Sequence, residues 1–177
     1  MKIKLLIGFF VLSWLLSTAC VSSHRSSGML YMHRKLYVRA AREFAAWVKE
    51  EPTNPEAHHW LAKVYIHLKE YQKAADELVK ACSLYGSSLS YGNLITEGEY
   101  ATLLYVAKQK LEQGQYQKAL VYYKCASFIN QSDVRPILAI AKIYEIQGQK
   151  ENALEYIKKA YILDPETTEK QFGSYLK

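Results

Sequence analysis

Three stretches of this chain follow one template. Each begins with an apolar residue followed by Ala-Lys, at Leu61, Val106 and Ile140. One alanine follows thirteen residues later and another seven residues after that, namely Ala74, Ala119 and Ala153, then Ala81, Ala126 and Ala160. The second and third stretches are 34 residues apart. A period of this length predicts stacked supersecondary units, which more often build binding surfaces than reaction centres.

Counted from Pro55, these positions give the chain a resemblance to the tetratricopeptide repeat, a helix-turn-helix unit of 34 residues. The motif has a small eighth residue and aromatic eleventh and seventeenth residues, found here as Ala62, Ala107 and Ala141, Tyr65 and Tyr144, and Tyr71 and Tyr116. Gly114 and Gly148 fall between paired helices, where a left-handed residue ends a helix without a Cβ clash. The resemblance implies an all-α helical solenoid of about three repeats.

The three repeats are expected at 55–86, 100–133 and 134–167. Their helix pairs are predicted to be 55–68 with 71–84, 100–113 with 116–130, and 134–147 with 150–163. Asp164-Pro165 ends the last unit, because proline biases the residue before it away from the helical region. An insertion over 87–99 separates the first two repeats and forms either a long loop or an extension of the next helix.

Both ends of the array need a cap with a face that tolerates water. Upstream, Tyr37, Ala40, Phe44 and Trp47 fit the second helix of a repeat. We therefore expect residues 29–52 to supply a capping half repeat, with one helix over 29–50. The polar tail, residues 168–177, is expected to cover the other end, although Gly173 weakens its helix.

The first nineteen residues have the layout of a secretory signal. Lys2 and Lys4 precede an uncharged stretch over 5–16, which is too short for a comfortable bilayer span. Small residues then lead to Cys20. This ending resembles a bacterial lipobox, although Ser17 replaces the usual leucine. The resemblance implies cleavage before Cys20 and fatty acids on that cysteine, with 20–28 as a polar tether. The alternatives are an ordinary signal with a chance cysteine and an uncleaved anchor.

The resemblance to lipoproteins implies a lipid-anchored protein of the bacterial cell envelope. Because Val21 rather than aspartate follows the cysteine, the outer membrane, on its periplasmic side, is expected if the organism is Gram-negative. Five cations, Arg25, Arg34, Lys35, Arg39 and Arg42, then precede the first acid. They could touch anionic headgroups, but one solvated helix face is the favoured interpretation. Of the net charge of +6, two charges belong to Lys2 and Lys4 in the signal, and the remaining +4 is too diffuse to indicate nucleic acid.

In tetratricopeptide arrays, the first helix of each pair lines the concave side. The family pattern places ten side chains on that side here, namely His59, Lys63, Ile66, His67, Leu104, Lys108, Leu111, Leu138, Lys142 and Ile146. Lys63, Lys108 and Lys142 occupy the same position in all three repeats. Lysines beside apolar side chains suit a partner protein that offers an acidic or amphipathic segment. The alternative is that this exposed position simply tolerates lysine.

The sequence contains no catalytic motif, phosphate-binding loop or zinc-helix spacing. His58, His59 and His67 are therefore expected to be packed or solvated, with no metal or other cofactor. Cys82 and Cys125 are expected to be separate thiols, and a disulfide is the alternative.

The function predicted from these features is a non-enzymatic adaptor that aids assembly or localisation of an envelope complex. Pilus, secretion and cell-wall machinery are the candidates. One alternative is a permanent structural subunit of such a complex. A weaker alternative is an envelope hydrolase that uses Glu56, His58 and His59.

Overall fold

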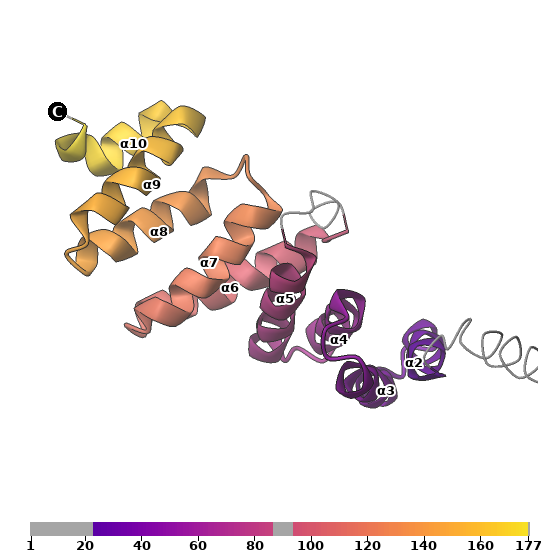
Figure 1. Cartoon of the computed structure of the whole chain (residues 1–177). Coiled ribbons are helices and arrows are strands. Elements are labelled where there is room, and N and C mark those ends of the chain that lie inside the picture. The colour runs from indigo at the N-terminus through magenta and orange to yellow at the C-terminus, as the bar shows by residue number, and fades with distance from the viewer. Residues whose placement is uncertain (1–22, 87–93, 177) are drawn as a thin grey trace, which may run out of the picture.

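The computed structural model describes residues 23–86 and 94–176, and this part of the chain contains nine α-helices and one short 3₁₀ helix. The helices are α2 (Ser23–His33), α3 (Tyr37–Glu50), α4 (Pro55–His67), α5 (Tyr71–Tyr85), α6 (Glu97–Glu112), α7 (Tyr116–Ile129), α8 (Val134–Ile146), α9 (Lys150–Leu163), α10 (Pro165–Phe172) and η1 (Gly173–Tyr175). They form an elongated array with α2 at one end and α10 at the other (Figure 1). The expected all-α helical repeat array is confirmed.

Consecutive helices pack as hairpins, α2 with α3, α4 with α5, α6 with α7, and α8 with α9. All the alanines of the repeated template are completely buried, which lets the helices approach closely. Their core divides into three clusters: one centred on α3 and α4, one on α5 to α8, and one on α8 to α10.

All four hairpins turn through one residue in the left-handed region. These residues are Lys35, Lys69, Gly114 and Gly148, with φ angles of 57°, 61°, 70° and 71°. Around each of them the backbone makes the same two hydrogen bonds to the end of the preceding helix, for example Lys35 N to Met32 O and Leu36 N to Tyr31 O, both 2.9 Å. Lys35 and Lys69 accept a conformation that glycine adopts more easily, because these bonds satisfy the helix end.

The prediction of one helix over 29–50 is wrong. The chain turns at Lys35 and forms two helices, so the N-terminal unit is a complete hairpin rather than a half repeat. The tether expected over 20–28 is also wrong from Ser23 onward, because Ser23–Gly28 belongs to α2. Gly28 permits this packing, since a Cβ there would lie 2.5 Å from the ring of Phe44.

Helix α6 begins three residues earlier than expected, inside the insertion predicted at 87–99. A capping box fixes this start: the Thr96 side chain accepts from the Glu99 amide, and the Glu99 carboxylate accepts from the Thr96 amide. The helix-extension interpretation therefore holds for residues 97–99, and residues 87–93 lie outside the described part of the chain.

The C-terminal residues fold back as helix α10. Asp164 caps this helix, Pro165 occupies its first turn, and Thr168 and Phe172 are buried against the last cluster. Helix α10 ends before Gly173, and it covers the apolar face that α8 and α9 would otherwise expose.

Candidate partner-binding surface

Helices α4, α6 and α8 carry the ten side chains expected on the concave side. The exposed members are His67, Lys108, Lys142 and Ile146, and the partly buried ones are Lys63, Ile66, Leu104 and Leu111. His59 and Leu138 are buried, with 7% and 6% of their surface exposed. The expected exposure of these last two residues is therefore wrong.

His59 is buried because its ring reaches the next repeat. Its Nε2 lies 2.7 Å from Oε1 of Glu99, the residue that also caps α6. Leu138 instead packs in the C-terminal cluster with Ala141 and Phe172. Neither residue offers a surface to a partner in this conformation.

The three equivalent lysines each meet a group of their own helix. The Lys63 ammonium lies 4.8 Å from the ring centroid of Trp60. Lys108 pairs with Glu112 at 3.8 Å, and Lys142 pairs with Glu145 at 2.5 Å. Exposed pairs of this kind contribute little to stability, so a partner's carboxylate could replace the intrahelical one.

Tyr105 of α6 is a candidate contact residue that the family pattern missed. Half of its surface is exposed, its ring packs edge-to-face on Tyr71 at 5.8 Å, and its hydroxyl accepts from Gln109 at 2.9 Å. It stands at the sixth position of its repeat, next to the expected fifth. An aromatic ring with a polar tip is a side chain enriched at protein interfaces. The sequence offered one signal for this residue: Tyr105 precedes Lys108 by three positions, which places both side chains on the same side of a helix.

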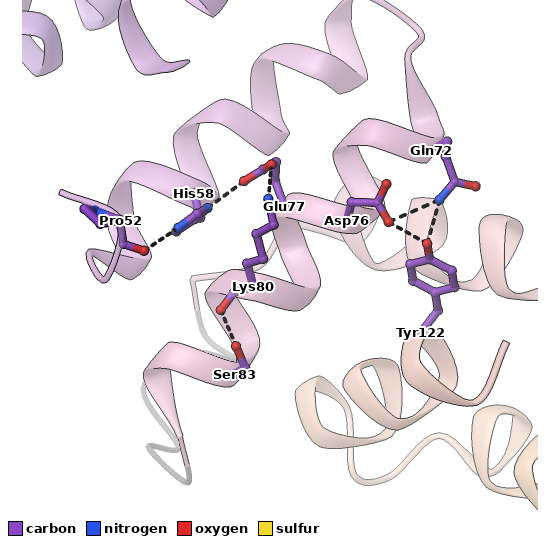
Figure 2. Close-up of polar contacts among 8 residues, drawn as sticks. All are labelled: Pro52, His58, Gln72, Asp76, Glu77, Lys80, Ser83 and Tyr122. Atoms are coloured by element: carbon purple, nitrogen blue, oxygen red, sulfur yellow. Dashed lines mark hydrogen bonds and ion pairs between the residues drawn. The ribbon is translucent and has the colours of Figure 1, made fainter. Parts of the chain in front are cut away.

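The residues of the hydrolase alternative do not converge. His58 lies between α4 and α5, where its ring nitrogens are 2.6 Å from the Glu77 carboxylate and 2.9 Å from the Pro52 carbonyl (Figure 2). His59 faces Glu99 of α6, and Glu56 accepts from Arg25 of α2. In the described part of the chain, no group of three His, Cys, Asp or Glu residues is placed to hold a metal ion.

Polar contacts tie the repeats together behind this surface. The Tyr122 hydroxyl of α7 donates to Asp76 of α5 at 2.6 Å and accepts from Gln72 at 2.6 Å (Figure 2). Burial and the Asp76 carboxylate raise the pKa of Tyr122 to about 12. Further along, the Tyr100 hydroxyl donates to Asp133, the N-cap of α8, at 2.8 Å. Burial and this carboxylate raise the pKa of Tyr100 strongly.

The thiols of Cys82 and Cys125 are both free, as expected, and they are neighbours. They lie on α5 and α7, close enough for each to affect the ionisation of the other, and no disulfide joins them. This contact lowers the pKa of Cys82, whereas the same contact and burial raise the pKa of Cys125 well above its ordinary value. Neither cysteine belongs to the surface formed by α4, α6 and α8.

No helix within residues 23–86 or 94–176 has the length and apolar character needed to cross a membrane. Cys20 and the apolar stretch over 5–16 lie outside the described residues.

Comparison with known proteins gives two family matches. Models described as tetratricopeptide repeat match residues 31–81 and residues 134–167. The first match runs from α2 to α5 and so includes the N-terminal hairpin. No curated protein matches the sequence significantly.

Several solved structures are similar. A crystal structure of MamA shares 18% identity over 80% of this chain and 72% of its own, with a TM-score of 0.46. A MamA fragment from Desulfovibrio magneticus RS-1 is 22% identical in sequence over 86% of this chain and 81% of its own, with a TM-score of 0.43. YrrB, described as a TPR protein with an unusual peptide-binding site, is 16% identical in sequence over 99% of this chain and 82% of its own, with a TM-score of 0.45. These similarities are too low to support an inference about function. The two family matches, which fall on helix hairpins of one array, identify the chain as a tetratricopeptide repeat-containing protein.

Proposed function

We propose that this protein is a membrane-anchored adaptor that holds a partner protein on the face of α4, α6 and α8 while an envelope complex is assembled or localised. Tetratricopeptide arrays are scaffolds for protein–protein interaction. The observation that carries the proposal is the set of equivalent lysines, Lys63, Lys108 and Lys142, on three successive first helices with partly exposed apolar side chains beside them.

The chemistry of this face favours an amphipathic partner segment with carboxylates. Ile66, Leu104, Leu111 and Ile146 are partly or largely accessible, so an apolar helix face can be buried against them. The lysines would steer the approach of an acidic segment, and the apolar contacts would hold it. Glu112 and Glu145 beside two of the lysines oppose a purely acidic ligand.

The anchor rests on Cys20 and the apolar stretch before it. Several acyl chains on one cysteine hold a protein stably to a bilayer, whereas one chain holds it marginally. Metabolic labelling with a fatty acid tests this part. The wild-type chain should incorporate the label and the Cys20→Ser chain should not. Persistent labelling of the variant would contradict lipidation at Cys20.

Photo-crosslinking in cells tests the binding face. The reagent p-benzoylphenylalanine replaces Tyr105 on α6 in one chain and Val121 on α7 in the matched control, since both side chains are about half exposed. The proposal predicts one dominant protein adduct from position 105 and little from position 121. Equal adducts from both positions would contradict a binding face on the first helices.

A permanent structural subunit remains the second candidate, because one apolar patch lies away from the lysines of α4, α6 and α8, mainly on the second helices α7 and α9. Ile162 at the end of α9 is 81% exposed and borders a groove of about 540 Å³ with Phe128, Ile137 and Leu163. Exposed apolar patches mark interaction sites. A dominant protein adduct from position 162, with none from position 105, would favour this candidate over the adaptor.

A further inference from the structure

The turn between α2 and α3 carries an exposed apolar surface at the N-terminal end of the array. Leu30, Leu36 and Val38 are 48%, 40% and 59% exposed. Leu36 and Val38 also line a shallow groove of about 450 Å³ next to Leu68. The opposite side of α3 packs inward through Ala40, Phe44 and Trp47, which are all buried, so the exposed apolar residues have no place in the core.

Four cations, Arg34, Lys35, Arg39 and Arg42, surround this surface. All are exposed, and none makes an ion pair within residues 23–86 and 94–176. Arg39 only approaches the Tyr31 ring, at 6.0 Å. The groove is lined by Lys35, Leu36, Tyr37, Val38, Arg39, Arg42 and Leu68 and so contains no acid.

The acids nearest in sequence are directed elsewhere. Glu43 and Glu50 of α3 both pair with His24, at 2.7 and 3.3 Å. Glu56 pairs with Arg25 at 2.8 Å. The α2–α3 turn therefore differs from the lysines of α4, α6 and α8, two of which have a carboxylate of their own helix beside them.

We propose that this turn is a membrane-contact surface, on which Leu36 and Val38 enter the headgroup region while the four cations bind anionic lipids. Apolar side chains ringed by Arg and Lys suit the interface of an anionic bilayer. An unopposed cluster of cations favours a surface of many anionic headgroups over an acidic protein segment, which offers fewer charges.

The position of the turn agrees with this partner. Helix α2 has 11 residues and is therefore about 16 Å long. It begins three residues after Cys20, so a bilayer that holds the anchor lies close to α2. Only the closeness of the bilayer to α2 rests on the proposed anchor. The exposed apolar residues and cations of the turn are observed independently of the anchor. With α2 lying along the bilayer, Leu30 on its exposed side and the following turn, which includes Arg34, would reach the headgroups.

Crosslinking to lipid in reconstituted vesicles tests the inference. The full chain carries p-benzoylphenylalanine in place of Val38 on α3 or, as the matched control, in place of Val121 on α7, where the exposed fraction is 48%. Vesicles contain phosphatidylcholine alone or with phosphatidylglycerol. We expect lipid adducts from position 38, few from position 121, and a strong loss from position 38 when the anionic lipid is omitted.

Charge removal gives a second arm. The triple change Arg34→Gln, Arg39→Gln and Arg42→Gln should lower lipid adducts from position 38 by well over about tenfold, since each basic residue near an anionic surface contributes about fivefold in binding and three such factors multiply to about a hundredfold. The control change Lys118→Gln, Lys158→Gln and Lys170→Gln removes three exposed cations elsewhere and should leave them unchanged.

Flotation of the vesicles reports the anchor separately from the turn. A chain that floats with neutral vesicles but gives equal lipid adducts from positions 38 and 121 would overturn this inference and leave the anchor intact. Protein adducts from position 38 in place of lipid adducts would also overturn it. A chain that fails to float with neutral vesicles yet gives charge-dependent lipid adducts from position 38 would support the inference and count against the anchor.

Discussion

His59 of α4 and Glu99 of α6 form a buried contact, 2.7 Å between Nε2 and Oε1, that joins the first and second repeats across forty residues of sequence. Only 2% of Glu99 is exposed, and its carboxylate also accepts from Thr96 at the start of α6. One carboxylate therefore fixes both the beginning of α6 and its attachment to α4.

The change His59→Phe should destabilise the protein by about 1.5–3 kcal/mol, the range for a hydrogen bond to a charged group, because it leaves Oε1 of the buried Glu99 carboxylate without its partner. Urea unfolding followed by circular dichroism measures this loss. The control is His67→Phe on the same helix, where phenylalanine can keep the stack on Tyr37. An equal loss in both variants would contradict a specific role for the His59–Glu99 contact.

The contribution of Glu99 should also depend on pH. Burial alone would raise its pKa, but the hydrogen bonds from His59 and Thr96 outweigh burial, and the pKa is lowered from 4.5. A carboxyl with a lowered folded pKa stabilises the fold above its unfolded pKa, and this contribution is lost as pH falls through the folded value. The stability gap between wild type and His59→Phe should therefore shrink below about pH 4.5. A gap that grows on acidification would contradict this assignment.

The change Tyr122→Phe should lower the free energy of unfolding by about 1 kcal/mol. It removes the hydroxyl by which α7 contacts Asp76 and Gln72 of α5. Tyr105→Phe is the control and should stay within about 0.5 kcal/mol, since its hydroxyl only accepts a hydrogen bond from Gln109 at the protein surface. Urea unfolding of both variants at neutral pH measures the difference.

The raised pKa of Tyr122 allows the Tyr122–Asp76 contact to be tested by measuring stability at alkaline pH. Because the folded pKa of about 12 lies above the ordinary value of 10.0, the Tyr122 contribution is complete below pH 10.0 and is lost as pH rises toward 12. Wild type should lose more stability than Tyr122→Phe over that interval. Parallel losses would show that the Tyr122–Asp76 contact is absent in solution.

The change Gly28→Ala should destabilise the N-terminal hairpin by about 1–3 kcal/mol, because the new methyl group would overlap the buried ring of Phe44. Gly98→Ala in α6 is the matched control. Its Cβ meets nothing within 4 Å, so it should stabilise the protein by about 0.4–1 kcal/mol. Thermal unfolding measures both. A stabilising Gly28→Ala would contradict the packing of α2 on α3.

Cys82 should react with iodoacetamide well before Cys125, because its pKa is lowered and its side chain is partly exposed, whereas Cys125 is buried with a raised pKa. Peptide mass spectrometry of a timed alkylation at neutral pH gives the two rates. Faster modification of Cys125 would contradict the observed placement of the pair. In Cys125→Ala, the rate at Cys82 should fall, since the neighbouring donor that lowers its pKa is gone.

The parts of the fold that follow from local pattern were predictable. Ala62, Ala107 and Ala141 recur at one position because paired helices cross there, and all three are completely buried. Gly114 and Gly148 marked two turns correctly, because glycine enters the left-handed region without strain. Lys35 adopts the same conformation but carries no such signal, so the N-terminal hairpin was predicted as one helix.

The candidate surface was predictable only in part. The position of a side chain within one repeat indicates which way it points, and this places Lys108 and Lys142 on the exposed face. His59 occupies an equivalent face but is buried, because its partner Glu99 comes from the extended start of α6. Contacts between distant segments leave no trace in the local pattern. Tyr105 was missed for a different reason: it occupies the sixth position of its repeat, and the family pattern names only the fifth.

The measurement that tests the binding face most directly is charge reversal of Lys63, Lys108 and Lys142 to glutamate, with capture of the partner from position 105 as the readout. The fold should tolerate this change, because none of the three ammonium groups is buried. Captured partner should fall by at least about tenfold, since like charges across an interface cost several kcal/mol and about 1.4 kcal/mol is a factor of ten.

The matched control reverses Lys49, Lys118 and Lys158, three exposed lysines on the second helices α3, α7 and α9. It imposes the same change in net charge on the other side of the hairpins and should leave capture unchanged. Capture that survives reversal of Lys63, Lys108 and Lys142, or that falls equally in the control, would contradict a partner held by the lysines of α4, α6 and α8.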